Sequence, residues 1–96
     1  VPLLPGVAEL AASGCIPGGT RRNLDDLADD VVWDDTLSEL QRLLMCDAQT
    51  SGGLLIAVPA DRADALLAEL AVELTPVAVV IGHVEAGPPG RIRISA

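Results

Sequence analysis

Residues 47–58 read DAQTSGGLLIAV, and this stretch decides how the rest of the chain is interpreted. Its polar part, Gln49, Thr50 and Ser51, supplies hydrogen-bonding groups. The Gly52-Gly53 pair that follows has no side chains to keep a ligand or another strand away from the main chain. Two successive glycine amides can also form a concave anion-binding nest. The pattern predicts a loop that either binds a ligand or is a capped turn that allows close packing.

An apolar run follows this loop without a break. Residues Gly53 to Val58 show no alternation of polar and apolar side chains, which is typical of a strand covered on both faces. Pro59 ends the run, because proline lacks the N–H that a sheet requires. We therefore predict a buried strand from Gly53 to Val58.

Residues 14–23 read GCIPGGTRRN and form a second candidate ligand segment. Pro17 and the two glycines after it predict a turn, and Asn23 can cap the element that follows. An oxyanion would find main-chain amides, a hydroxyl and two guanidinium groups here. These groups belong to Gly18, Gly19, Thr20, Arg21 and Arg22. A structural turn with two solvated arginines explains the same residues, so both interpretations stay open.

The two segments together resemble the selenophosphate synthetases, or selenide, water dikinases. The first is similar to that family's DPQTSGGLL signature, with Ala48 where the family usually has proline, and the second to its PGGTxxN segment. The order and the interval of the two motifs also fit. The resemblance covers nearly the whole chain but corresponds only to the last part of that enzyme.

The resemblance implies an enzyme that uses ATP, Mg²⁺ and water to convert selenide into selenophosphate, releasing AMP and phosphate. Its reactive cysteine or selenocysteine, metal-binding aspartates and most of its nucleotide site lie in an N-terminal domain absent from this chain. The resemblance therefore assigns no catalytic or metal-binding residue here. It implies a homodimer in which this domain helps to enclose the substrate and phosphate cleft. The location is expected to be cytoplasmic, because the chain shows no apolar segment of a secretory signal. The candidate cleft residues are Gly18, Gly19, Thr20, Asn23, Gln49, Thr50, Ser51, Gly52 and Gly53.

Composition limits the other functions that the chain can have. Its 96 residues suit a single domain spanning residues 1–96, and the start at Val1 rather than methionine is consistent with a fragment. A formal net charge of −8, with six arginines and no lysine, argues against nucleic acid or an anionic membrane as a partner and against a Walker phosphate loop. No apolar run reaches the roughly 20 residues that a membrane helix needs. Cys15 and Cys46 are too few for a zinc knuckle and are expected to be reduced packing residues.

The first part of the chain predicts short helices. One opens at Pro5, with Val7, Leu10 and Ala11 on its apolar side and Gly14 just beyond its end. Another follows the TLSE sequence of residues 36–39, a capping box built on Thr36 and Glu39, and ends near Met45 or Cys46. The apolar stripe of this second helix comprises Leu37, Leu40, Leu43 and Leu44.

Between these helices the chain is rich in aspartate. Residues 24–35 hold six aspartates without the spacing of a calcium loop, so a solvated acidic face is expected. The segment predicts a short helix or irregular turns leading to Trp33. Because no other aromatic residue accompanies Trp33, packing is favoured over ligand stacking.

The last part of the chain predicts a helix between strands. An amphipathic helix from Ala60 to Leu74 precedes a second apolar strand from Val77 to Val84, in which Gly82 marks a bulge or a close approach. Strand, helix and strand of this length indicate a right-handed crossover between parallel strands. Residues Arg91 to Ser95 alternate like a half-exposed edge strand that returns antiparallel, with its arginines facing water. The apolar face of the helix comprises Ala63, Leu66, Leu67, Leu70 and Leu74.

This order of elements predicts an α+β fold, a mixed β-sheet with packed helices. The C-terminal domains of aminoimidazole ribonucleotide synthetase-like proteins have such an architecture, as the resemblance implies. His83 has no ligand at metal-binding spacing and is expected to be structural. Two alternatives remain for the function: a non-catalytic regulatory or interaction domain, and a related synthetase acting on a nucleotide or thiamin substrate.

Overall fold

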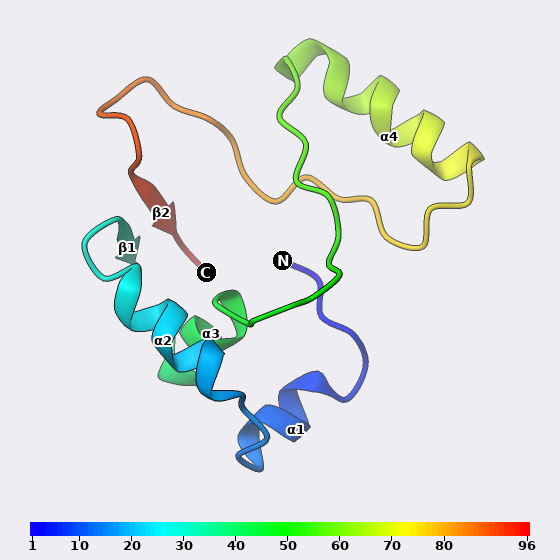
Figure 1. Ribbon diagram of the computed structural model, residues 1–96. Helices are drawn as coiled ribbons and strands as arrows, with labels where there is room; N and C mark the ends of the chain where they lie inside the picture. Colours follow the sequence, from blue (N-terminus) through cyan, green and yellow to red (C-terminus); the bar gives the residue numbers. More distant parts are fainter. The chain divides into compact units, whose positions relative to one another are not determined.

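The computed structural model describes residues 1–96 and divides into two compact units. The first unit contains Leu3–Ser51 and Gly87–Ala96, and the second contains Gly52–Ala86; of the two remaining residues, Val1 belongs to the first and Pro2 to the second. Helices and a two-stranded parallel sheet make up the chain, so the predicted α+β class is confirmed (Figure 1). No helix in the chain is both long enough and apolar enough to cross a membrane.

The sheet of the first unit joins segments that are far apart in the sequence. Strand β1 (Val31–Trp33) pairs in parallel with strand β2 (Ile92–Ile94), and the two lie side by side in Figure 1. The prediction that the last strand runs antiparallel is wrong. That prediction assumed a return along the preceding strand, whereas β2 pairs with β1, which lies far earlier in the chain.

Two further bonds extend the ladder at its ends. The Ile92 amide donates to the Asp30 carbonyl at 3.0 Å, and the Asp34 amide donates to the Ile94 carbonyl at 2.9 Å. Arg91 and Arg93 are exposed, as predicted for a half-exposed strand. The Arg91 guanidinium also donates to the Asp29 carbonyl, which ties the end of the chain to the acidic turn.

Helix α1 (Val7–Ala12) ends in the way that its sequence predicts. The amide of Gly14 donates to Ala11 and that of Cys15 donates to Leu10, both at 3.0 Å. These two bonds form a Schellman motif, and Gly14 supplies the positive φ of 91° that the motif requires. The helix begins at Val7, two residues after the predicted start at Pro5, and Gly6 is its N-cap residue.

Helices α2 (Gly18–Asp26) and α3 (Glu39–Met45) pack against each other. The glycines of the PGG sequence do not form a separate turn but the first turn of α2, so Asn23 lies inside the helix and does not cap a following one. A capping box does start α3, but its residues are Ser38 and Gln41 rather than Thr36 and Glu39. Thr36 instead bonds to a residue two positions earlier: its hydroxyl donates to the Asp34 carboxylate at 2.6 Å.

The core of the first unit is small and aliphatic. One side chain each from α1 and β1 and two from α3 and its end are buried: Ala11, Val31, Leu43 and Cys46. Trp33 is half-buried, in agreement with the predicted packing role. The one fully buried polar side chain is Thr20 of α2, which is 2% exposed.

The second unit is built on the predicted amphipathic helix. It begins as a short 3₁₀ helix, η1 (Ala60–Arg62), and continues as α4 (Ala63–Val72). Four residues of the predicted apolar face are half-buried, namely Ala63, Leu66, Leu67 and Leu70. The fifth, Leu74, is 85% exposed because it lies beyond the last helical turn.

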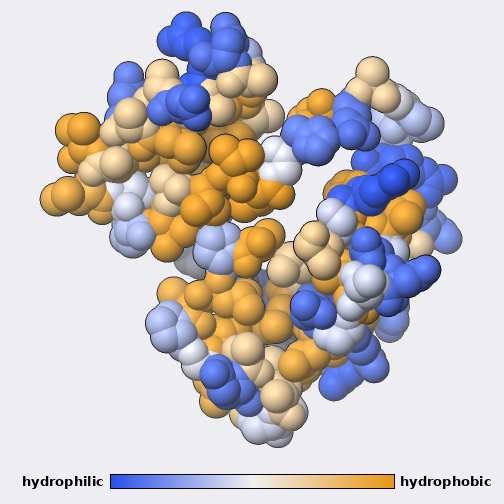
Figure 2. Space-filling model, turned by 180° about the vertical axis from the view of Figure 1, so that it is seen from behind, coloured by the Kyte–Doolittle hydropathy of each residue, from blue (hydrophilic) through white to orange (hydrophobic).

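The two strands predicted for the second unit are not observed. Residues 53–58 and 77–84 run without strand pairing, and their main-chain groups make no hydrogen bond to another segment. The predicted crossover and the bulge at Gly82 are therefore wrong. Leu54 and Val84 are both 90% exposed, and Figure 2 shows apolar side chains gathered on the surface around α4 and its flanking segments. An extended segment becomes a strand only when a partner satisfies its amides and carbonyls.

Candidate functional site

The two motif segments meet at the side chain of Thr20. This residue lies in the first turn of α2, and its hydroxyl donates to Oδ1 of Asp47 at 3.0 Å. The same oxygen accepts the main-chain N–H of Ala48 at 3.3 Å. Thr20 is 2% exposed, so a single buried hydroxyl joins the middle of one motif to the start of the other.

A second bond is formed one helical turn further along α2. The Asn23 amide donates from Nδ2 to the Cys46 carbonyl at 3.0 Å. Residues three positions apart lie on the same face of a helix, so Thr20 and Asn23 both contact the end of α3 and the residues that follow it. Thr20 therefore bonds directly to the DAQTSGG segment, and Asn23 bonds to Cys46, the residue just before it.

The two glycines of α2 differ in their surroundings. A Cβ on Gly19 would lie 3.3 Å from the Cβ of Ala48, which is tighter than an ordinary contact, whereas a Cβ on Gly18 would meet nothing within 4 Å. Gly19 therefore allows the segment at Ala48 to approach α2 closely. No such approach requires glycine at position 18.

The polar residues of the second motif are exposed to solvent. Gln49 donates from Nε2 to Oδ2 of Asp47 at 3.4 Å, and the side chains of Thr50 and Ser51 are exposed next to it. The Gly52-Gly53 pair is also exposed and belongs to the second unit. The structure thus brings together Gly19, Thr20, Asn23 and the start of the second motif, and the ligand role of these residues stays a prediction.

Asp47 is the central residue of this arrangement and was not among the predicted site residues. Its two carboxylate oxygens accept from Thr20 and from Gln49. Asp47 is the one carboxylate of the DAQTSGG sequence and is its first residue. Because a carboxylate accepts two or more hydrogen bonds, its position next to a hydroxyl-bearing motif was the available signal.

The paired arginines of α2 point to solvent. Nη1 of Arg21 lies 4.0 Å from Oε1 of Glu39, and the two side chains are 57% and 80% exposed. An ion pair of this length and exposure is screened by water and contributes little to stability. Arg22 is exposed as well, so both guanidinium groups remain accessible to an anion.

The thiols and the histidine do not form a reactive group. Both cysteines are free, and burial raises the pKa of the Cys46 thiol, which disfavours the nucleophilic thiolate. Nε2 of His83 lies 2.9 Å from Oε1 of Glu85 on an exposed part of the second unit. No three His, Cys, Asp or Glu side chains are arranged to hold a metal ion, so the residues present do not fit a Mg²⁺ site.

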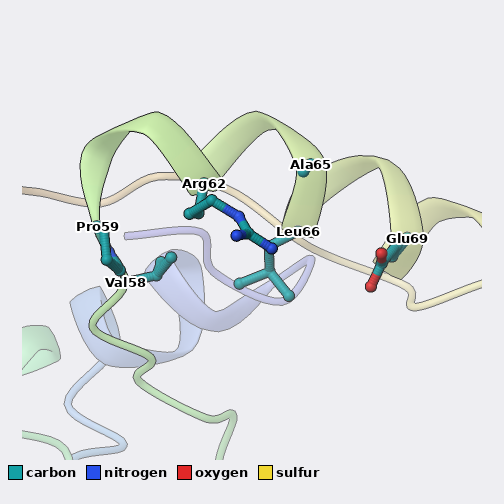
Figure 3. Close-up of a pocket in the computed structure, with 6 residues that line it drawn as sticks. All are labelled: Val58, Pro59, Arg62, Ala65, Leu66 and Glu69. Atoms are coloured by element: carbon teal, nitrogen blue, oxygen red, sulfur yellow. The ribbon is translucent and has the colours of Figure 1, made fainter.

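Two hollows in the surface are lined by residues outside the motifs. One, of about 390 Å³, lies against one side of η1 and α4 and is lined by the six residues labelled in Figure 3, including Arg62, Leu66 and Glu69. The other, of about 640 Å³, is bordered by Leu24, Trp33 and Arg42 in the first unit. Neither hollow includes a candidate cleft residue.

Comparison with known proteins gives the family. The model of the AIR synthase related protein C-terminal domain matches residues 6–95, and the chain belongs to this family. No solved structure matches the chain.

Several relatives of the chain carry the name selenide, water dikinase. The relative from Pseudomonas putida is 46% identical over 84 residues, covering 84% of this chain and 24% of that protein. The relative from Photobacterium profundum is 52% identical over 61 residues, covering 64% and 17%. The relative from Shewanella sp. (strain W3-18-1) is 46% identical over 80 residues, covering 82% and 22%. The resemblance to selenophosphate synthetases is thus confirmed, and the chain spans about a quarter or less of these relatives.

Proposed function

We propose that this chain is the C-terminal part of an ATP-dependent selenide, water dikinase and forms one wall of its active cleft. The observation that carries the proposal is the buried Thr20 hydroxyl, which bonds Asp47 and the Ala48 amide and so joins two motifs 28 residues apart. Two polar segments held together in this way are placed to act on one ligand. The names of the relatives supply the reaction class.

The chemistry of the reaction divides between this domain and the rest of the enzyme. Phosphoryl transfer needs a positioned nucleophile and cations that neutralise charge on phosphate oxygens. This chain offers exposed guanidinium groups at Arg21 and Arg22 and hydroxyls at Thr50 and Ser51. ATP, Mg²⁺ and the nucleophile are assigned to an N-terminal domain, and the selenide and phosphate cleft lies along the loops described here.

The proposal includes a partner and a location. An N-terminal domain of the same polypeptide is the first partner, and a homodimer of the whole enzyme is the assembly that we expect. The two free cysteines fit a reducing compartment such as the cytoplasm. Neither nucleic acid nor membrane suits a chain with a formal net charge of −8.

A hybrid enzyme tests the function. In the Pseudomonas putida relative, the corresponding C-terminal quarter is replaced by this chain, and selenophosphate and AMP are followed by ³¹P NMR with selenide and ATP. We expect selenophosphate formation at a rate within about tenfold of that of the relative, and its loss in a hybrid carrying both Thr20→Ala and Ser51→Ala.

Two outcomes of this experiment oppose the proposal. A folded hybrid that makes no selenophosphate indicates a non-catalytic interaction domain or a synthetase of another substrate. A hybrid whose double variant is fully active shows that the two loops are only architectural.

A further inference from the structure

The hydrogen bonds around Asp47 run in one direction only. The main-chain N–H of Ala48 can only donate, so Oγ1 of Thr20 accepts from it at 3.3 Å. The Thr20 hydroxyl must then give its own hydrogen to another group, and Oδ1 of Asp47 accepts it at 3.0 Å. The remaining oxygen of this carboxylate, Oδ2, lies 3.4 Å from Nε2 of Gln49.

This direction determines which end of the Gln49 amide turns outward. An ionised carboxylate has no hydrogen to donate, so only the NH₂ group of Gln49 can bond to it. The carbonyl oxygen, on the other branch of the planar amide, then points away from Asp47. The Asp47 carboxylate, which also accepts from the buried Thr20 hydroxyl, thus sets the orientation of an exposed side chain.

We propose that Asp47 is a positioning residue that makes Gln49 present its amide oxygen to the ligand. A presented oxygen accepts hydrogen bonds, so the ligand group at this point of the loop is a donor, a hydroxyl or an amino group rather than a bare phosphate oxygen. This assignment of ligand chemistry rests on the proposed function, since it takes the loop to line the cleft. The orientation of Gln49 stands on the hydrogen bonds alone.

The variant Asp47→Asn keeps the fold around Thr20 but changes the group that Gln49 presents. Asparagine keeps one acceptor, which the buried Thr20 hydroxyl requires, and turns its own NH₂ group toward Gln49. Gln49 is exposed and can rotate its amide to accept this hydrogen, so the fold is retained while the presented group changes from an acceptor to a donor. Asp35→Asn, at another exposed aspartate of the first unit, is the matched control.

Side-chain NMR of the 96-residue chain tests the orientation without any assay of activity. We expect the Gln49 NH₂ protons to exchange slowly with water and to show a scalar coupling across the hydrogen bond to the Asp47 carboxyl carbon. Both signals should be lost in Asp47→Asn and kept in Asp35→Asn. Gln49 NH₂ protons that exchange equally fast in all three proteins overturn the proposal.

Kinetics of the hybrid enzyme test the ligand chemistry. We expect Asp47→Asn to raise KM for ATP, which carries hydroxyl and amino donors, about tenfold while kcat changes less than threefold. Asp35→Asn, outside the joined motifs, is expected to behave like the parent hybrid. Unchanged KM values in Asp47→Asn overturn the ligand assignment. If the parent hybrid itself is inactive, the proposed function fails, and the NMR result still decides the orientation of Gln49.

Discussion

Thr20 shows how much a single buried hydroxyl can determine. It is the fully buried polar side chain of the first unit, and it satisfies one carboxylate oxygen and one main-chain amide. A buried polar group that loses its partner costs more than the bond contributed, because the group has been removed from water without compensation. The PGGT sequence is therefore a structural requirement as well as a candidate ligand segment.

We expect Thr20→Val to destabilise the first unit by about 1–3 kcal/mol, because valine has the same shape but makes neither the bond to the Asp47 carboxylate nor the bond from the Ala48 amide. Thr20→Ser keeps the hydroxyl and serves as the control, with a smaller loss. Urea unfolding followed by the fluorescence of Trp33, which lies in the same unit, measures both. Equal stability of the valine variant and the native chain would show that the bond is not formed.

Asp34 makes the stability of the first unit depend on pH. The hydroxyl and the amide of Thr36 both donate to this carboxylate and hold its pKa below the ordinary value of 3.8. A carboxyl group whose pKa is lower in the folded state adds stability above its unfolded pKa and loses it as the pH falls through the folded pKa. We expect the urea midpoint to fall as the pH drops from 5 to 2.

The variant Thr36→Val isolates this contribution. It removes the hydroxyl but keeps the amide, so the Asp34 pKa, measured by carboxyl NMR titration, is expected to rise toward 3.8. The fall of the urea midpoint with acid then becomes shallower. An Asp34 pKa at or above 3.8 in the native chain contradicts the prediction.

At the scale of the element, the ends of two helices use the same motif with different residues. Helix α4 closes with Leu74 donating to Ala71 at 3.2 Å and Thr75 donating to Leu70 at 3.0 Å. This repeats the end of α1, but the residue with positive φ is Leu74, at 56°, where α1 has Gly14. A left-handed conformation costs a residue with a Cβ roughly 1–2 kcal/mol.

We expect Leu74→Gly to stabilise α4 by about 0.5–1 kcal/mol, because it relieves this conformation and an 85% exposed side chain gives up little burial. The opposite change at the equivalent position, Gly14→Leu, is expected to destabilise α1 by a similar amount. Thermal unfolding followed by helix circular dichroism compares the two variants. A loss of helix stability in Leu74→Gly contradicts this account.

Helices were more predictable than strands for a physical reason. A helix satisfies its amides within itself, so the periodicity around Leu66 and Leu70 was enough to predict α4, and Gly14 was enough to end α1. The choice between Thr36 and Ser38 as a cap depends on which hydroxyl meets a competing acceptor, here Asp34, and a motif alone does not contain that information.

At the scale of the whole molecule, strands depend on partners that a sequence does not name. The alternating residues 91–95 predicted β2 but not its parallel pairing with β1, in which Val31 lies opposite Ile92, 61 residues further along the chain. The candidate site was predictable as two motifs, whereas the bonds that join them appear only in the folded chain. Its central residue, Asp47, was missed because its role arises only when the Thr20 hydroxyl reaches it.

Amide hydrogen exchange tests, along the entire chain, the difference between hydrogen-bonded helices and segments without a main-chain partner. Exchange is slow where an amide is hydrogen-bonded in a stable element and fast where it is free. We expect the amides inside α2, α3 and α4 to be protected, and those of residues 53–58 and 77–84, which have no main-chain partner, to exchange at nearly the rate of an unstructured peptide. The exposed apolar side chains of these two segments, such as Leu54 and Val84, do not slow exchange by themselves. Strong protection within both segments would mean that they pair as the strands which their composition predicts, and the unpaired arrangement of the second unit would then be wrong.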